Sequence, residues 1–431
     1  MTTTPSHRLY WLAAVIFSAL IACARSPGGV GTPPYLIALA VAGIAYLLAV
    51  REFFRKQRFS RKVVLICLAL AALWRIPFLL MPIGPDDDIH RYLWDGRVQR
   101  LGYNPYNLIP GDPALAGLHT AETRGLNNPE VPTPYPAGAQ LFFRAVTTIH
   151  ESIFAFKMAF VVCDFAIVLL LLDELRRSGQ GEHWVLAYAW HPLIALNVVG
   201  SGHVDILGAL LLLVSAVAIG RSWRMIAAVA FGLAIAVKFL PIVLTPLYWR
   251  RVRIRDAFAA AVVFAALYVP FLNGWHAPVG SLGTFLQRFR FNDPVFAMLE
   301  RMASPQTVAG LAGVVGLITA GWLRSEPPAC EADKWAWPMA ASLACSPVVY
   351  PWYLLWLLPF LRSRSILPLM VWTVSILPTY LVWHLRTLGQ QWRVPGWVLL
   401  LEYGSVAVAA GIVIFHRTTQ RLAHQGPGKS R

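Results

Sequence analysis

Three consecutive carboxylates, Asp86, Asp87 and Asp88, begin the densest cluster of charge in an otherwise apolar chain. A carboxylate in such a cluster can act as a general base on a hydroxyl group, and a pair can bind a cation. The structural alternative is helix capping, for which one acidic residue suffices while the others favour the positive end of the helix dipole. Because three acids exceed that need, we predict that Asp88 is catalytic, with Asp86 as its main competitor and Asp87 as a substrate contact.

The residues after Asp88 predict a short helix with further functional groups. Two apolar lines at helical spacing run through residues 89–101, a pattern typical of an amphipathic helix. We expect this helix to lie in the membrane interface, and on the structural alternative Asp88 would be its N-cap. Arg91 and Tyr92, on the same short segment, are further candidate substrate contacts.

Polar and aromatic residues of later segments form a second set of candidates. Each has a structural alternative: a His-x-Asp pair in a loop is common, and arginines that alternate with aromatic residues gather at lipid headgroups. The functional alternative is contact with a sugar or with an anionic donor group, through charge or ring stacking. The candidates in this set are His203, Asp205, Lys238, Arg288, Arg290, Tyr350, Trp352 and Tyr353.

Three charged side chains lie within or beside apolar runs, where a charge is costly unless it lines a cavity, pairs or reaches the interface. For Lys238 the alternatives are such a reach to the interface and pairing with a substrate phosphate. For Arg75 we expect a reach to the outer interface. For Asp164 we expect a structural partner that the sequence does not identify.

Composition places these groups in a membrane protein. Hydrophobic residues make up 57% of the 431 residues and charged residues only 13%, about half the share in soluble domains. The net charge of +16 could suggest nucleic acid, but the basic residues lie in short clusters between apolar runs, so we exclude that partner. Five cysteines without metal-site spacing predict neither a disulfide framework nor a zinc site.

About a dozen apolar runs predict membrane spans, and two of them are interrupted. Lys238 with Pro241 interrupts one run, and Pro347 with Pro351 interrupts another, so both are candidate broken helices. The fold class is therefore all-α, a polytopic bundle of about 11 to 14 transmembrane helices. The expected runs are near 9–24, 35–50, 63–82, 154–172, 184–200, 204–220, 225–249, 256–273, 307–323, 335–361, 366–384 and 396–415.

Orientation follows from arginine and lysine in short loops, which favour the cytoplasm. The basic loop 51–62 and the basic tail are the clearest inside markers, which predicts cytoplasmic termini in a plasma (inner) membrane protein. We expect the first apolar run to be a retained span, because the residues that follow it are a poor cleavage site. The chain then forms one integral membrane domain, 1–431, with an extracytoplasmic catalytic loop at 83–150, a second outer loop at 274–305 and a cytoplasmic tail at 416–431.

Several of these segments together resemble a known enzyme family. They are the acidic motif with Gly-Tyr-Asn-Pro-Tyr at 102–106, Pro-Tyr-Pro at 134–136, Gly-His-Val-Asp at 202–205, Lys-Phe-Leu-Pro at 238–241, and Ser-Pro-Val-Val-Tyr-Pro-Trp-Tyr at 346–353. The chain resembles polyprenol-phosphate-mannose-dependent mannosyltransferases of the GT-C superfamily, family 87 and the actinobacterial alpha-1,6-mannosyltransferases included. The resemblance implies a multi-span helical fold, an extracytoplasmic site, a lipid-phosphate sugar donor and catalysis by an aspartate in an early outer loop.

We therefore expect an enzyme that transfers a hexose, most simply mannose, from a polyprenyl phosphate to a glycan or glycolipid acceptor. A phosphate leaves without protonation, so one base with cations to neutralise it can suffice. Two alternatives are a ligase or polymerase that uses a polyprenyl diphosphate donor and a secondary transporter. We expect no cofactor; a divalent cation on the carboxylates is possible but not favoured, because outer lysines and arginines offer a metal-free clamp.

Overall fold

The computed structural model describes residues 7–55, 58–83, 87–273, 278–324 and 332–424. Within these residues every regular element is a helix, and the one extended pairing is a single bridge between Phe291 and Val348. The first half contains α1 (His7–Ala24), α2 (Pro33–Arg55), α3 (Arg61–Leu80), α4 (Asp88–Arg100), η1 (Pro105–Asn107), η2 (Pro113–Leu118), η3 (Thr123–Gly125), α5 (Ala137–Ile149), α6 (Ile153–Arg177), η4 (Glu182–Trp184), α7 (Val185–Ala189), η5 (Ile194–Gly200) and α8 (Asp205–Gly220).

The second half is more broken. It contains α9 (Arg224–Val237), η6 (Leu240–Tyr248), α10 (Ile254–Tyr268), η7 (Val269–Phe271), α11 (Leu282–Arg288), α12 (Pro294–Leu299), α13 (Pro305–Arg324), α14 (Ala332–Ala344), η8 (Pro351–Trp356), η9 (Leu358–Phe360), η10 (Arg364–Ile366), α15 (Leu367–Ser375), η11 (Leu377–Tyr380), α16 (Leu381–Thr387) and α17 (Gly396–His424). Proline lies at the first or second position of nine of the short helices in the described residues, where its fixed φ fits and its missing N–H costs nothing.

Eight helical stretches in the described residues are long and apolar enough to cross a membrane, and a ninth candidate is the bent pair η5 and α8. This confirms an all-α polytopic membrane protein. The number is below the expected 11 to 14, because several expected spans fold as short pieces. The 225–249 run divides at Lys238, and the 335–361 run divides between α14 and η8, so both predicted breaks are confirmed.

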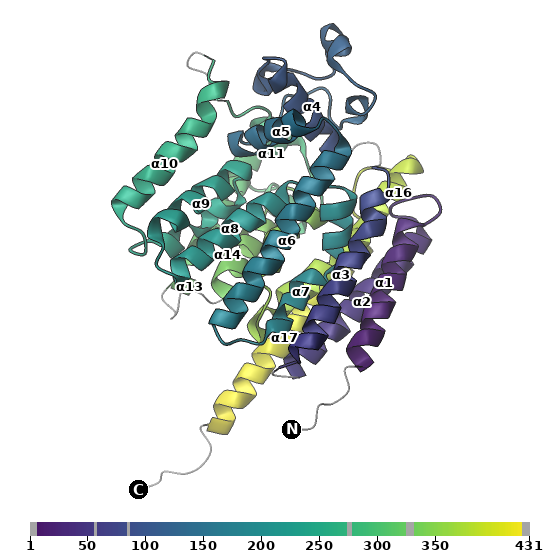
Figure 1. The fold of residues 1–431 in the computed structure, drawn as a ribbon, viewed down its shortest axis with the longest axis vertical. Helices are drawn as coiled ribbons and strands as arrows, with labels where there is room; N and C mark the ends of the chain where they lie inside the picture. The colour runs from purple at the N-terminus through teal and green to yellow at the C-terminus, as the bar shows by residue number, and fades with distance from the viewer. Residues whose placement is uncertain (1–6, 56–57, 84–86, 274–277, 325–331, 425–431) are drawn as a thin grey trace.

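The helices that face outward are apolar on their exposed sides. Ile254 and Phe258 on α10, and Leu400 and Phe415 on α17, each expose more than 60% of their surface. Such exposure suits contact with lipid tails rather than water. In Figure 1, α4 and α5 form one end of the molecule, while the start of α1 and the end of α17 both lie at the other end. Helices α4 and α5 and the two ends of the described chain are therefore on opposite sides of the bundle.

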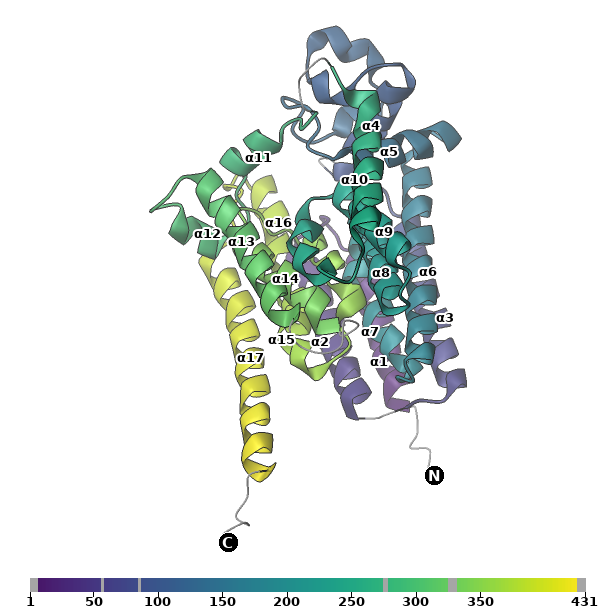
Figure 2. The same cartoon turned by 90° about the vertical axis from the view of Figure 1, so that its left-hand side faces the viewer.

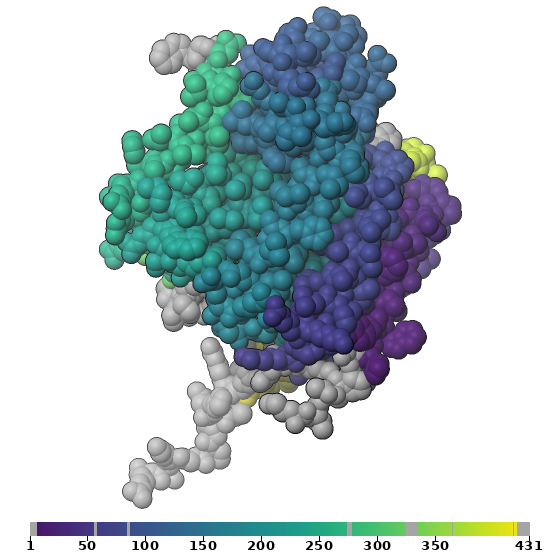
Figure 3. Space-filling model, viewed as in Figure 1, coloured from purple at the N-terminus to yellow at the C-terminus, as the bar shows by residue number. Residues whose placement is uncertain are grey.

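Residues 88–150 form a cap over this end of the bundle (Figure 3). Helix α4 exists as predicted, but nearly all of its residues are buried against α5, α6 and the 101–136 loop. The predicted exposed polar face of this helix is therefore wrong, while its location in the membrane interface stays a prediction. The sequence pattern could not reveal that a long loop folds back over the polar side of this helix.

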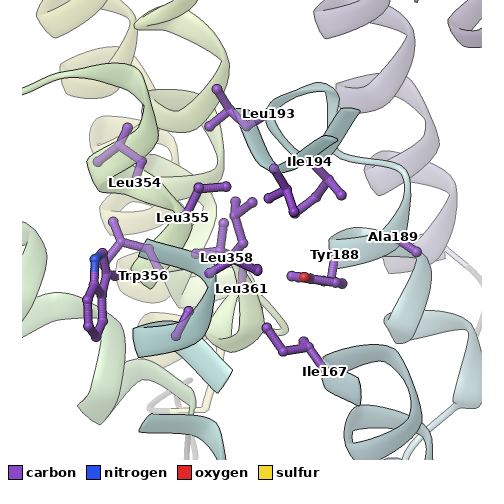
Figure 4. Packing of buried hydrophobic residues seen from close by; sticks show 14 of the residues in the cluster. Ile167, Tyr188, Ala189, Leu193, Ile194, Leu354, Leu355, Trp356, Leu358 and Leu361 are labelled. Carbon is purple, nitrogen blue, oxygen red and sulfur yellow. The ribbon is translucent and has the colours of Figure 1, made fainter. Parts of the chain in front are cut away.

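The core lies where the first and second halves of the chain meet. Figure 4 shows leucines of residues 354–361 facing Leu193, Ile194 and Tyr188 in the middle of the bundle. In Figure 2, α8 and α9 run beside α6, while α11 to α17 occupy the other side of the molecule. Helices η8 and η9 are buried in this core, and η8 packs against α8. This packing places the aromatic residues at the start of η8 beside α8.

Two intramembrane charges form a buried pair in this bundle. Arg75 Nε and Nη2 donate to the two carboxylate oxygens of Asp164 at 2.5 and 3.1 Å, and Tyr188 Oη donates to Asp164 at 3.0 Å. The expected reach of Arg75 to the interface is therefore wrong, because the side chain is 6% exposed and points inward. Asp164 has the structural partner that the sequence could not identify.

Candidate active site

Asp88 is the first residue of α4, and its side chain points away from the helix backbone. Asp87 takes the N-cap position with extended backbone, so the structural alternative in which Asp88 is the N-cap is wrong. Asn127 Nδ2 donates to Asp88 Oδ1 at 2.7 Å, and His203 Nδ1 lies 3.5 Å from Asp88 Oδ2. The Asp88 side chain is 19% exposed, so it is held by neighbours yet remains accessible.

Arg91 organises the loop that supplies Asn127. One turn along α4 from the acidic motif, its guanidinium donates to the backbone carbonyls of Asn127, Asn128 and Val131 at 2.7 to 3.2 Å. Five donors in a fixed fork allow one arginine to hold several carbonyls at once. Arg91 therefore positions the partner of Asp88, and its hydrogen bonds are with the protein rather than directed into an open site.

The surroundings of Asp88 favour its ionised form. Burial alone would raise the pKa of this carboxyl, but the interactions with His203 and Asn127 and the positive charge of Lys238 hold its pKa below the ordinary value. The first turn of a helix also favours negative charge. Asp88 is therefore a carboxylate at neutral pH and is available to accept a proton.

His203 reaches Asp88 because the chain bends sharply before α8. The axes of η5 and α8 differ by 113°, and Gly202 has φ +70°, a backbone conformation that suits glycine. The His203 ring is 1% exposed and stacks on Trp352 with centroids 4.1 Å apart. Trp352 stacks in turn on Tyr350 at 4.4 Å. Both ring nitrogens of His203 are buried, and neither meets the criteria for a hydrogen bond within the described residues.

Lys238 and Asp205 form an ion pair close to this stack. Lys238 is the C-cap of α9, and its ammonium donates to Asp205 Oδ1 at 2.7 Å. Trp356 Nε1 donates to the same oxygen at 2.7 Å, and the ammonium lies 3.6 Å above the ring of Tyr353. The Asp205 side chain is 2% exposed and that of Lys238 is 23% exposed, so the acid is buried and the lysine is partly accessible.

Tyr92 joins these two parts of the site. Its hydroxyl accepts a hydrogen bond from Val204 N at 3.4 Å, which links α4 to the turn between His203 and Asp205. The ring is fully buried and stacks on Phe143 at 4.4 Å. Burial raises the pKa of the Tyr92 hydroxyl well above its ordinary value, so the group stays protonated. Tyr92 therefore supports the site from behind.

The structure thus brings most of the predicted site residues together and leaves others apart. The group around Asp88 contains Tyr92, His203, Asp205, Lys238, Tyr350, Trp352 and Tyr353. Arg290 lies elsewhere, paired with Glu300 at 2.8 Å, and Arg288 is exposed at the end of α11. Asp87 occupies the N-cap position of α4, and Asp86 lies outside the described residues.

Two residues that sequence reasoning missed complete the site. Asn127 is an uncharged residue in a long polar loop, so no pattern distinguishes it from Asn128. Trp356 belongs to an apolar run rich in tryptophan, and only its indole N–H contact with Asp205 gives it a role. Both act through contacts between segments more than 35 residues apart.

No group of three or more His, Cys, Asp or Glu side chains that could hold a metal ion is found in the part of the chain that the structure describes. Because this search excludes Asp86, the prediction about a divalent cation stays a prediction.

Two protein-family models match the chain, each over more than half of its length. Residues 13–252 match the N-terminal domain of alpha-(1->6)-mannopyranosyltransferase, and residues 133–382 match glycosyltransferase family 87. No curated protein and no solved structure gives a significant match. Between them the two matched ranges include Asp88, His203, Lys238 and the 350–356 segment, and they overlap over residues 133–252. The chain therefore belongs to glycosyltransferase family 87, as a membrane-embedded mannosyltransferase.

Proposed function

We propose that this mannosyltransferase takes mannose from a polyprenyl-phosphate donor and transfers it to a hydroxyl of a glycan or glycolipid at the extracytoplasmic face. The observation that carries the proposal is the environment of Asp88. An ionised, partly exposed carboxylate is held by Asn127 and faces His203, beside the Lys238 and Asp205 pair.

In the proposed reaction Asp88 is the general base. The acceptor oxygen attacks the anomeric carbon of the donor while Asp88 takes the hydroxyl proton, and the bond from this carbon to the phosphate oxygen breaks. Asp88 Oδ1 accepts only one hydrogen bond within the described residues and has a second lone pair for the acceptor hydroxyl. The electron pair leaves with the phosphate, which needs no proton.

The leaving phosphate needs positive or hydrogen-bonding groups, and two are near Asp88. His203 presents a buried Nε2 without a hydrogen-bond partner in the described residues, and the Lys238 side chain is partly exposed. His203 precedes α8 and Lys238 follows α9, so both lie at the same end of this pair of apolar helices, a setting that suits a lipid-linked substrate. Because Lys238 is already paired with Asp205, its positive charge is largely neutralised. We propose that the lysine contributes a hydrogen bond to the phosphate more than a net charge.

The proposed orientation rests on the charge pattern and on the ends of the fold. The basic loop 51–62 and the basic tail favour the cytoplasm. The end of α17 lies opposite α4 in Figures 1 and 2, so a cytoplasmic tail puts Asp88 outside. A polyprenyl-phosphate donor is consistent with a site at this face, because nucleotide-activated sugars in the cytoplasm do not reach it.

The proposal is tested with purified protein and two labelled donors, polyprenyl-phosphate mannose and polyprenyl-diphosphate-linked mannose. We expect transfer from the monophosphate donor alone, with an alkali-stable glycosidic product identified by mass spectrometry. Transfer from the diphosphate donor alone would replace the proposal with the ligase alternative. Uptake of sugar into vesicles with no transferred product would favour a transporter, an alternative that family membership disfavours.

A further inference from the structure

Glu402 is a buried carboxyl group in a membrane-spanning helix that takes no part in the mechanism above. It lies two turns into α17 and is fully buried. Its Oε1 accepts hydrogen bonds from Trp372 Nε1 at 2.6 Å and from Asn292 Nδ2 at 3.0 Å, while Oε2 is buried without a hydrogen-bond partner in the described residues. A buried acid with half of its hydrogen-bonding capacity unmet costs stability, so packing alone would favour a hydrocarbon side chain here.

Asn292 connects this carboxyl group to the loop between α11 and α12. The residue is 2% exposed and has φ +53°, a left-handed conformation that asparagine tolerates better than most residues. Its side-chain amide also donates to Val349 O at 3.4 Å. The backbone carbonyl of Asn292 accepts a hydrogen bond from Tyr403 Oη at 3.2 Å. One side chain thus joins α17 to the segment that precedes η8.

The segment beside Asn292 supports the aromatic stack of the site. Phe291 pairs with Val348 in the bridge described above, with Phe291 N to Pro347 O at 3.1 Å and Val349 N to Phe291 O at 2.9 Å. The Phe291 ring packs on Tyr350 with centroids 4.5 Å apart. Tyr350 is the outer ring of the stack that continues through Trp352 to His203, which faces Asp88.

We infer that Glu402 is a positioning residue for catalysis. Through Asn292 it holds residues 289–293 against residues 347–350, and this pairing fixes the Tyr350 and Trp352 rings that keep His203 against Asp88. The inference rests on the proposed role of Asp88. It adds that the geometry of the site depends on Glu402, a residue of a membrane-spanning helix outside the site. A displacement of about 1 Å at the reacting groups can lower a rate by about 100-fold, and loss of one remote support is expected to lower it about tenfold.

The test compares Glu402→Leu, Asn292→Gly and the double variant in the full-length purified protein. Glycine at 292 removes the amide while keeping the left-handed backbone accessible. We expect each single variant to lower kcat about tenfold, and the double variant to be no slower than either, because the two residues act through one contact. Hydrogen exchange of residues 289–293 and 347–353 should rise in all three, which is a readout independent of any donor.

Two further variants separate positioning from general packing. Glu402→Gln keeps an oxygen that can accept both hydrogen bonds, so kcat and exchange should return to within about threefold of the original protein. Trp372→Phe removes the other hydrogen bond to Glu402 Oε1 but leaves Asn292 in place, so it should lower the melting temperature without changing kcat or exchange at 347–353.

Unchanged kcat and exchange in folded Glu402→Leu and Asn292→Gly would overturn the inference, as would an equal loss of kcat in Trp372→Phe. Asp88→Asn, measured in parallel, separates this failure from failure of the proposed function. If Asp88→Asn is inactive while the Glu402 and Asn292 variants are fully active, only the positioning role fails. If Asp88→Asn keeps full activity, the assignment of Asp88 fails.

Discussion

The pair formed by Lys238 and Asp205 gives a prediction whose direction depends on which partner is removed. Asp205 is almost completely buried, whereas Lys238 keeps nearly a quarter of its side chain exposed. Removal of the lysine, as in Lys238→Met, leaves a buried carboxylate with only Trp356 as a hydrogen-bond donor to Oδ1. Breaking a buried ion pair in this way costs about 3 to 5 kcal/mol.

Removal of the acid should cost less. Asp205→Asn keeps an oxygen that can accept from both Lys238 and Trp356, and the lysine can turn further toward solvent or rest on the Tyr353 ring. The expected cost is about 1 to 2 kcal/mol, the value of charge-assisted hydrogen bonds weakened to neutral ones. The structure therefore predicts that Lys238→Met is the more destabilising substitution.

The assay is thermal unfolding of the purified variants in one detergent, followed by the loss of monodisperse protein in size-exclusion chromatography. The original protein should have the highest midpoint, Asp205→Asn an intermediate one and Lys238→Met the lowest. The double variant Lys238→Met with Asp205→Leu should recover part of the loss, because no unpaired charge remains buried. A Lys238→Met protein as stable as the original, or less harmed than Asp205→Asn, would refute the burial and pairing described for these residues.

Two further predictions concern neighbours of the site. In Gly208→Ala the new methyl group would overlap the ring of Trp356, so we expect the free energy of unfolding to fall by about 1 to 3 kcal/mol in the same unfolding assay. The control is Gly404→Ala, at a glycine with open space, which should unfold like the original protein. Asn127→Ala removes a hydrogen bond that lowers the pKa of Asp88, so that pKa should rise toward its ordinary value and the acid limb of kcat/KM against pH should move to higher pH. An unmoved acid limb would show that Asn127 does not tune the base.

Much of the fold could be predicted because each span carries its own apolar signal. The breaks at Lys238 and before Pro351 were also predictable, since a charge or a proline pair within an apolar run is a local feature. The pairing of Arg75 with Asp164 was not, because it joins α3 to α6 and depends on how two helices pack. The burial of α4 was missed for the same reason, since the way the following loop folds back over the helix depends on tertiary contacts such as those of Arg91.

The candidate site shows the same division. Asp88, His203 and Lys238 were identifiable because polar groups are rare in this chain, and the structure places them together. Arg290 was selected because arginines alternate with aromatic residues in that segment, but it pairs with Glu300, ten residues further along the chain. The sequence therefore identifies candidate functional residues, because polar residue types stand out in an apolar chain. The hydrogen-bond or ion-pair partner of each candidate is decided by tertiary contacts.

The central claim is that Asp88 is the general base, and the most direct test is the turnover of Asp88→Asn at saturating donor and acceptor. Asparagine preserves size and one acceptor oxygen but cannot take the hydroxyl proton. Asp112→Asn is the matched control, because Asp112 lies in the loop that follows α4 and caps η2. We predict that kcat falls by about 100- to 10,000-fold in Asp88→Asn while its unfolding midpoint and the activity of Asp112→Asn are unchanged. A folded Asp88→Asn protein with the original kcat would contradict the account.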